Sequence, residues 1–200
     1  MTNLVGLLNF AKANAISMPK RVLLIGGPST GKSTLIEALK EKGHPCMPEI
    51  SREVTKAAQQ QGVEQLFLTE PLLFSELLLR ARIKQFEQAL TFDAPFVFID
   101  RGIPDTVAYM DYIGQSYTQE FTTACKTYIY DAVYLLPPWE EIHTTDSERY
   151  EDFEHAKALH HALLSTYQAY GYKPIEVPKA SVPQRSAFIL DHLEHICKTH

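Results

Sequence analysis

The residues of this chain whose types and spacing could do chemistry lie between an apolar run and a helical pattern near the amino terminus. They fit the motif G-x-x-x-x-G-K-[ST] and comprise Gly26, Gly27, Pro28, Ser29, Thr30, Gly31, Lys32, Ser33 and Thr34. Val22–Ile25 precede them as a predicted strand, and Leu35–Lys40 follow with helical spacing. This is the context in which the motif forms a P-loop, so the stretch predicts a site that binds a nucleoside triphosphate, ATP or GTP.

Each residue type in this stretch suits a phosphate chain. Gly26 and Gly31 let the backbone turn tightly and aim its N–H groups at one anion. The helix that begins there adds unpaired N–H groups and the positive end of its dipole. Lys32 is predicted to reach the β and γ phosphates, and the Ser33 hydroxyl to ligate Mg²⁺. The alternative is a glycine-rich turn with a chance lysine, which the complete pattern disfavours.

A second group of candidates ends a strongly apolar run. Pro95–Ile99 is typical of a central parallel strand, and Asp100 stands at its tip. A carboxylate there can help to hold Mg²⁺ or can accept a proton from an acceptor hydroxyl. The alternative is a surface ion pair between Asp100 and Arg101. Pro104 and Asp105 open the next predicted helix, and Asp105 is a further candidate for substrate binding.

Charged residues also follow a short strand predicted at residues 44–48, whose prolines suit the edge of a sheet. Because ligands bind beyond the carboxyl ends of the strands in open α/β sheets, Glu49 and Arg52 are candidates for contacts with the acceptor. Glu49 competes with Asp100 for the role of general base. The alternative is structural, with Ser51 capping the helix that follows.

Arginines elsewhere offer further contacts with phosphate. The polar stretch 139–152 is too long for a simple connection and is predicted to be a lid, in which Arg149 could neutralise transferring phosphate or could be a surface residue. A long helix is predicted from Pro71 to about Leu90. Its Arg80 and Arg82 are expected to be solvated, with the alternative that one arginine turns inward toward a phosphate acceptor.

The elements that position these residues alternate between strand and helix along the chain. Strands are predicted near residues 22–25, 44–48, 95–100, 132–136 and 174–178. This order predicts the α/β class: a P-loop NTPase with a doubly wound parallel sheet of about five strands, helices on both faces and a polar lid. We expect residues 20–200 to form one domain. Residues 1–19 are predicted to be a leader, either an amphipathic membrane-surface helix or a short packed or frayed segment.

Composition limits the possible partners and the compartment. The 200 residues are 45% hydrophobic, enough for one domain with a sizeable core, and the net charge of −5 disfavours general nucleic-acid binding. Cys46, Cys125 and Cys197 form no Cys-x-x-Cys pair, which is typical of reduced thiols in a cytoplasmic protein. No apolar run approaches the roughly 18 residues of a membrane span.

The strand-tip acid bears on the type of reaction. Asp100 is followed by arginine rather than by the second acid that motor ATPases commonly use to activate water, and no guanine-reading Asn-Lys-x-Asp motif is present. A compact P-loop protein with a lid is built like a small-molecule kinase, in which water is excluded. The alternative is a nucleotide-dependent switch or slow ATPase that engages a partner protein or a lipid headgroup.

From about Lys20 onward, the chain resembles the P-loop family of AAA-like ATPase and kinase domains related to the nicotinamide riboside kinase of bacterial NadR proteins, a family that also includes animal proteins binding GTP and phosphoinositides. The resemblance rests on the P-loop, on Glu49–Val54, on Phe98–Asp105 and on the segment from Asp146–Glu151 to Tyr170–Tyr172. We expect a departure from NadR in these 200 residues, because none of them is assigned to an adenylyltransferase domain.

The resemblance implies an ATP- and Mg²⁺-dependent phosphotransferase that acts on a small-molecule acceptor with a hydroxyl, such as a nucleoside. It places Glu49 near the acceptor, and the pair Asp100–Arg101 beside the reacting hydroxyl and phosphate. Arg101, Arg52 and Arg149 follow as contacts to phosphate or acceptor. The identity of the acceptor stays open.

Overall fold

One parallel sheet organises the computed structural model, which describes residues 18–60, 62–63, 65–142 and 153–198. In these residues the sheet has five strands in the order β2-β3-β1-β4-β5, and every neighbouring pair is parallel. The strands are β1 (Lys20–Ile25), β2 (Cys46–Met47), β3 (Phe96–Asp100), β4 (Ala132–Leu135) and β5 (Ile175–Glu176). The P-loop strand therefore lies at the centre of the sheet, and the short β2 and β5 form its edges.

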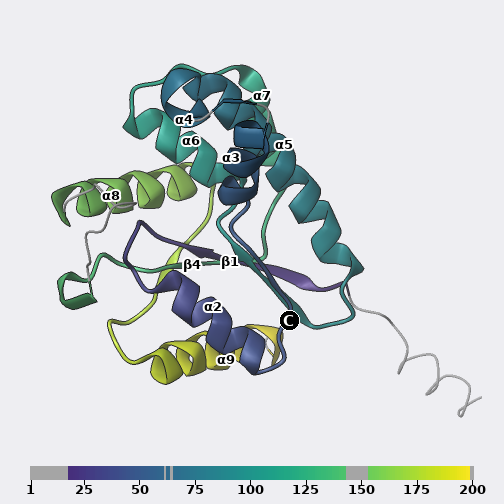
Figure 1. Ribbon diagram of the computed structural model, residues 1–200. Helices are drawn as coiled ribbons and strands as arrows, with labels where there is room; N and C mark the ends of the chain where they lie inside the picture. The colour runs from purple at the N-terminus through teal and green to yellow at the C-terminus, as the bar shows by residue number, and fades with distance from the viewer. Residues whose placement is uncertain (1–17, 61, 64, 143–152, 199–200) are drawn as a thin grey trace, which may run out of the picture.

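Helices cover both faces of this sheet (Figure 1). The layer below the sheet in that view consists of α2 (Lys32–Glu41) and α9 (Val182–Lys198). The layer above it contains α3 (Ser51–Gln60), α4 (Leu66–Thr69), α5 (Pro71–Gln88), α6 (Ile103–Tyr112), α7 (Gln119–Thr127) and α8 (Phe153–Ala169). Two single-turn 3₁₀ helices occupy Ala89–Thr91 and Glu140–Ile142.

The central strand divides the core into two parts, because successive side chains of a strand point to opposite faces. Val22 and Leu24 pack into the apolar cluster between the sheet and the helices α2 and α9. Leu23 and Ile25 pack into the larger cluster beneath α5, α6 and α8. All four side chains are fully buried, which explains why the run reads as continuously apolar rather than alternating.

The predicted architecture is confirmed: the chain has an α/β fold with a doubly wound parallel sheet of five strands in the described residues and helices on both faces. The helix α4 was not predicted, because four residues are too few to show helical periodicity. The three cysteines are free thiols. Among the helices of the described ranges, none has the length and apolar character needed to span a bilayer.

Two sequence predictions fall outside the described residues. The lid predicted at 139–152 is described only from Trp139 to Ile142, so Arg149 lies beyond it. Of the predicted leader, 1–19, the structure describes only Met18 and Pro19.

Candidate active site

The phosphate loop, residues Gly26–Thr34, joins the carboxyl end of β1 to α2. Gly26 and Gly31 have φ of 154° and 75°, in the region that favours glycine. A Cβ on Gly26 would lie 2.8 Å from the Leu136 carbonyl oxygen, so the loop packs against the end of β4 without room for a side chain. Inside the loop, the Thr30 hydroxyl donates to the Gly27 carbonyl at 3.0 Å. These contacts fix the turn through which the backbone passes into the helix.

Lys32 and Asp100 meet at the carboxyl ends of two neighbouring strands. β1 pairs with β3, with Leu24 opposite Asp100, so the tip of β3 faces the start of α2. Lys32 Nζ donates to Asp100 Oδ1 at 2.5 Å, and both side chains are buried. Burial raises the pKa of the Asp100 carboxyl, although the charge of Lys32 acts in the opposite direction. The predicted phosphate lysine and the predicted strand-tip acid therefore share one buried site.

Beside this pair lies a charge cluster, which we define as Glu49, Arg82, Arg101 and Asp105. Arg101 Nε forms an ion pair with Glu49 Oε2, and Arg101 Nη1 lies 3.5 Å from Asp105 Oδ1. Arg101 has φ of 68°, a left-handed conformation that costs a non-glycine residue about 1–3 kcal/mol. Two carboxylates thus hold one guanidinium on a strained turn, next to Asp100.

Glu49 is charged because of its neighbours. Burial raises the pKa of this carboxyl, but Arg101, Arg82 and Lys32 outweigh that effect and hold the pKa at about 2. The same carboxylate accepts a hydrogen bond from the Ser51 backbone N–H at 3.2 Å, at the start of α3. A carboxylate with so low a pKa is a good hydrogen-bond acceptor and a weak base.

Arg82 corrects a prediction. It was expected to be solvated, but the structure buries it at 3% exposure. Its Nη1 donates to Thr106 Oγ1 at 2.7 Å, and its Nη2 lies 3.6 Å from Glu49 Oε1. One arginine of α5 therefore turns inward, as the alternative had it, and its contact with a phosphate acceptor stays a prediction. Its position on the apolar stripe with Leu78, Leu79 and Phe86 was the available signal.

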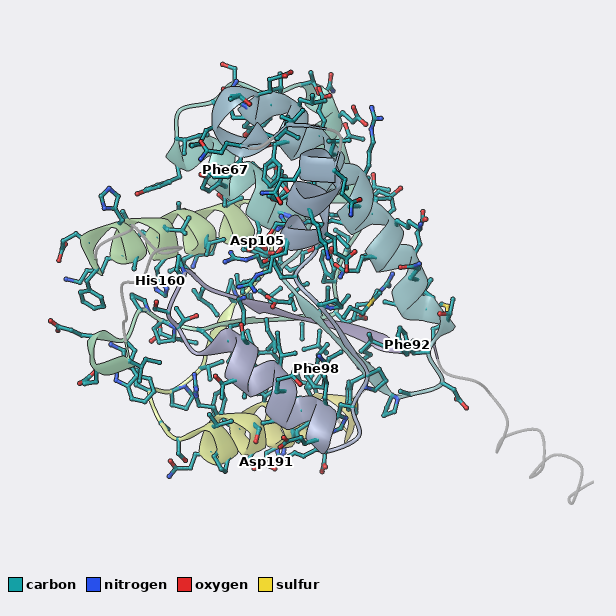
Figure 2. All side chains as sticks on the ribbon, viewed as in Figure 1. Phe67, Phe92, Phe98, Asp105, His160 and Asp191 are labelled. Atoms are coloured by element: carbon teal, nitrogen blue, oxygen red, sulfur yellow. The ribbon has the colours of Figure 1, made fainter. Side chains whose placement is uncertain are left out.

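Asp105 is turned into the protein. Its Oδ2 accepts hydrogen bonds from the Gly102 backbone N–H at 2.8 Å and from the Tyr167 hydroxyl at 2.6 Å. Figure 2 shows Asp105 between the sheet and the helices above it. A Cβ on Gly102 would lie 2.5 Å from Leu23 Cδ1, so the turn requires glycine. These contacts favour an organising role for Asp105, and its substrate role stays a prediction.

The other predicted site residues lie around this centre. Ser33 and Thr34 are exposed in the first turn of α2, and Arg52 is exposed in the first turn of α3. In the described part of the chain, no three His, Cys, Asp or Glu side chains gather into a metal cage. The Ser33 hydroxyl and the Asp100 carboxylate nevertheless suit Mg²⁺, because this ion is bound by few protein oxygens together with phosphates.

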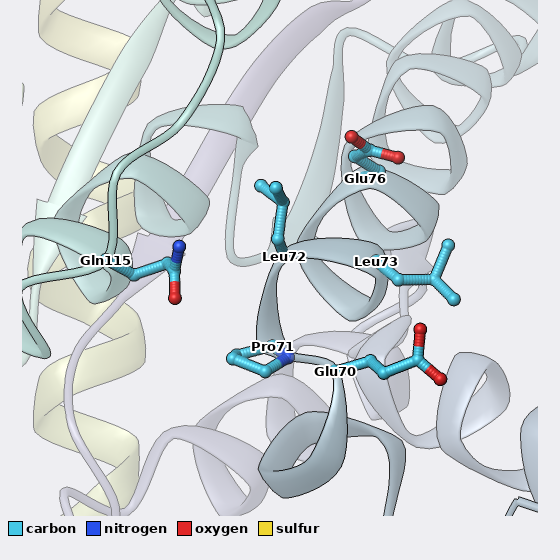
Figure 3. Close-up of a pocket in the computed structure, with 6 residues that line it drawn as sticks. All are labelled: Glu70, Pro71, Leu72, Leu73, Glu76 and Gln115. Carbon is cyan, nitrogen blue, oxygen red and sulfur yellow. The ribbon is translucent and has the colours of Figure 1, made fainter.

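Two surface hollows lie elsewhere. One, of about 340 Å³, is lined by Glu70, Pro71, Leu72, Leu73, Glu76 and Gln115 at the amino end of α5 (Figure 3). The other, of about 410 Å³, lies at the amino end of β4 and includes Asp131 and Tyr172. Neither includes a residue of the phosphate loop or the charge cluster, and ligands of such sheets bind at the carboxyl ends of the strands.

Comparisons with known proteins agree with this fold. A family model described as AAA domain matches residues 21–185. A thymidylate kinase from Candida albicans is 17% identical, with a TM-score of 0.67 and coverage of 92% of this chain and 94% of that one. A deoxyadenosine kinase from M. mycoides, solved with dCMP and dCDP, is 18% identical, with a TM-score of 0.62 and coverage of 88% and 99%.

A NadR protein in complex with NR has the same fold at 17% identity, with a TM-score of 0.65. The alignment covers 89% of this chain and 50% of that chain, so this chain matches half of that protein. No curated protein matches by sequence. The resemblance to the NadR-type P-loop proteins is confirmed.

Proposed function

The chain belongs to the AAA domain family, and on this premise we propose that it is a kinase that transfers the γ-phosphoryl group of ATP to a hydroxyl of a nucleoside-like acceptor. The observation that carries the proposal is the contact between the P-loop lysine and a strand-tip carboxylate, directly beside a cluster of buried and partly buried charges. A hydrolase needs only a site for water, whereas this cluster offers fixed polar groups to a larger acceptor.

In the proposed reaction the acceptor oxygen forms a bond to the γ phosphorus, the bond from that phosphorus to the β–γ bridging oxygen breaks, and ADP leaves. Asp100 takes the hydroxyl proton, because burial raises the pKa of this carboxyl. Glu49, with its pKa of about 2, accepts a hydrogen bond from the acceptor. Lys32 and the loop amides stabilise the phosphate charge, and Arg101, Arg52 and Arg149 are further contacts.

The Ser33 hydroxyl would ligate Mg²⁺, with Asp100 either as the base or, alternatively, as an outer partner of the ion, and the ion would neutralise charge on the phosphate oxygens. Ser33 lies next to Lys32 in the first turn of α2, so its hydroxyl is offered from the same turn that presents the lysine. Both belong to the end of the sheet where the charge cluster lies.

The test is to incubate the protein with γ-labelled ATP, Mg²⁺ and a pool of nucleosides and related hydroxyl compounds, and to follow the label. We expect label on a pool member at a rate well above the release of free phosphate. Free phosphate alone, unchanged by every pool, would overturn the kinase proposal and favour the switch or ATPase that engages a protein or lipid partner. The Lys32→Ala variant serves as the blank.

A further inference from the structure

Arg185, in the first turn of α9, contacts the phosphate loop. It is buried at 4% exposure. Its Nη1 donates to the Thr30 carbonyl oxygen at 3.1 Å, across a separation of 155 residues. A Cβ on Gly31 would lie 2.8 Å from Arg185 Nη2, so the guanidinium fills the space that a side chain at this position would need.

The start of α9 holds this arginine in place. The Ser181 backbone N–H and hydroxyl both donate to Gln184 Oε1, at 3.1 and 2.8 Å, and Pro183 stands in the first turn. These contacts are those of a capped helix end. The Arg185 backbone N–H donates to the Ser181 carbonyl at 2.9 Å, so the arginine projects from a fixed turn.

Trp139, the single tryptophan of the chain, also lies near the guanidinium. Arg185 Cζ is 5.8 Å from the centroid of its ring, within the range of a cation–π contact. Arg185 Nε is buried and has no hydrogen-bond partner among the described residues. In surroundings so poor in water, the bond to the Thr30 carbonyl is stronger than it would be at the surface.

The Thr30 carbonyl and the Gly31 N–H belong to one peptide group, which is planar with the two bonds pointing in opposite directions. A guanidinium that holds the Thr30 oxygen on its own side therefore aims the Gly31 N–H to the opposite side. Withdrawal of electron density from that oxygen also makes the same N–H a better donor, because hydrogen bonds in a chain polarise one another.

We propose that Arg185 is a positioning residue that sets the direction and donor strength of the Gly31 amide, and so the affinity of the phosphate loop for a triphosphate chain. The inference rests on the nucleotide-binding half of the proposed function and not on the transfer step. It predicts that Arg185 acts on the phosphates rather than on the base of the nucleotide.

The test compares two ligands by calorimetry: MgATP, and inorganic tripolyphosphate with Mg²⁺, which has no base. In Arg185→Gln, both affinities should fall by about the same factor, on the order of tenfold, since a hydrogen bond from a charged donor is lost. Arg185→Lys, which keeps the charge, should recover part of the loss for both ligands. Lys126→Gln, which removes a charge on the distant α7, is the matched control and should bind both as the wild type does.

A weaker affinity for MgATP with an unchanged affinity for tripolyphosphate would overturn the proposal in favour of a contact with the base. Unchanged affinities for both ligands would leave Arg185 a purely structural residue. Should Arg185→Gln not fold, Arg185→Lys carries the comparison. The ¹⁵N–¹H resonance of Gly31 gives a direct reading: it should shift in Arg185→Lys while that of Gly114 does not.

The outcomes also separate this inference from the proposed function. A wild-type protein that binds both ligands but transfers no phosphoryl group overturns the kinase proposal alone. A wild-type protein that binds neither overturns both.

Discussion

The phosphate loop and the charge cluster lie side by side, yet they are built in different ways. The loop is one continuous stretch, and the groups proposed to bind phosphate are its backbone N–H groups, whose directions follow from local turns at Gly26 and Gly31. The cluster is assembled from side chains that follow β2 and β3 and that project from α5 and α6. This difference indicates that a short stretch of sequence can specify a phosphate-binding loop. A site for an acceptor instead requires side chains that only the folded sheet brings together.

The two regions also treat charge differently. In the loop, the positive end of the dipole of α2 points toward the site, and Lys32 is paired with Asp100. The cluster balances its charges internally, with Glu49 and Asp105 around Arg101. We therefore expect variants of the loop to act on the nucleotide, and variants of the cluster to act on folding and on the acceptor.

The largest effect is expected from Lys32→Ala. It removes the cation predicted to contact the phosphates and also leaves the buried Asp100 carboxylate without its partner. Phosphoryl transfer, followed with the label assay, should fall by about a hundredfold to a thousandfold or more. Lys40→Ala, on the exposed face of the same helix, should retain wild-type activity. Equal activity of wild type and Lys32→Ala would refute the assignment of the loop.

An intermediate effect is expected from Glu49→Gln on the pH dependence of stability. The folded-state pKa of about 2 lies below the ordinary 4.5, so the unfolded chain binds the proton more tightly. Glu49 therefore stabilises the fold above pH 4.5, and this contribution is lost as the pH falls toward 2. At full strength it amounts to about 3 kcal/mol.

The measurement is the unfolding free energy from urea titrations at pH 3 and pH 6. The difference between the two should shrink in Glu49→Gln and should stay as in the wild type in Glu53→Gln, an exposed residue of α3. The same difference in all three proteins would show that the cluster does not hold Glu49 in its charged form.

The smallest effect is expected from Tyr167→Phe, which removes the hydroxyl that donates to Asp105 at 2.6 Å. The loss of a hydrogen bond to a charged acceptor should lower the unfolding free energy by about 1.5–3 kcal/mol, and the affinity for MgATP should not change. Tyr112→Phe, on α6, is the control and should stay within about 0.5 kcal/mol of the wild type. A large loss of nucleotide affinity in Tyr167→Phe would mean that the two regions are not separable.

Much of this architecture could be predicted from the sequence. The apolar runs around Val22 and Phe98 identified central strands because both of their faces are buried. The start of the helix after Asp100 was predicted from Pro104 and Asp105, which lie in the first turn of α6. Each of these features depends on residues close together in the chain, so composition and spacing were sufficient.

The contacts that the sequence did not predict join residues that are far apart in the chain. From the sequence, Arg82 was expected to be a solvated helix residue. Its burial follows from the packing of α5 against α6 and the end of β2, where Arg82 contacts Thr106 and Glu49. Arg185 carried no signal at all, because its acceptor on Thr30 lies 155 residues away.

The sequence by itself determined the phosphate loop, because the directions of its backbone N–H groups depend only on the glycines of the loop and on the helix that follows. The tertiary structure alone decided which charges surround it. A buried arginine is stable only where carboxylates and hydroxyls meet it, and those groups come together only when the order of the strands is set.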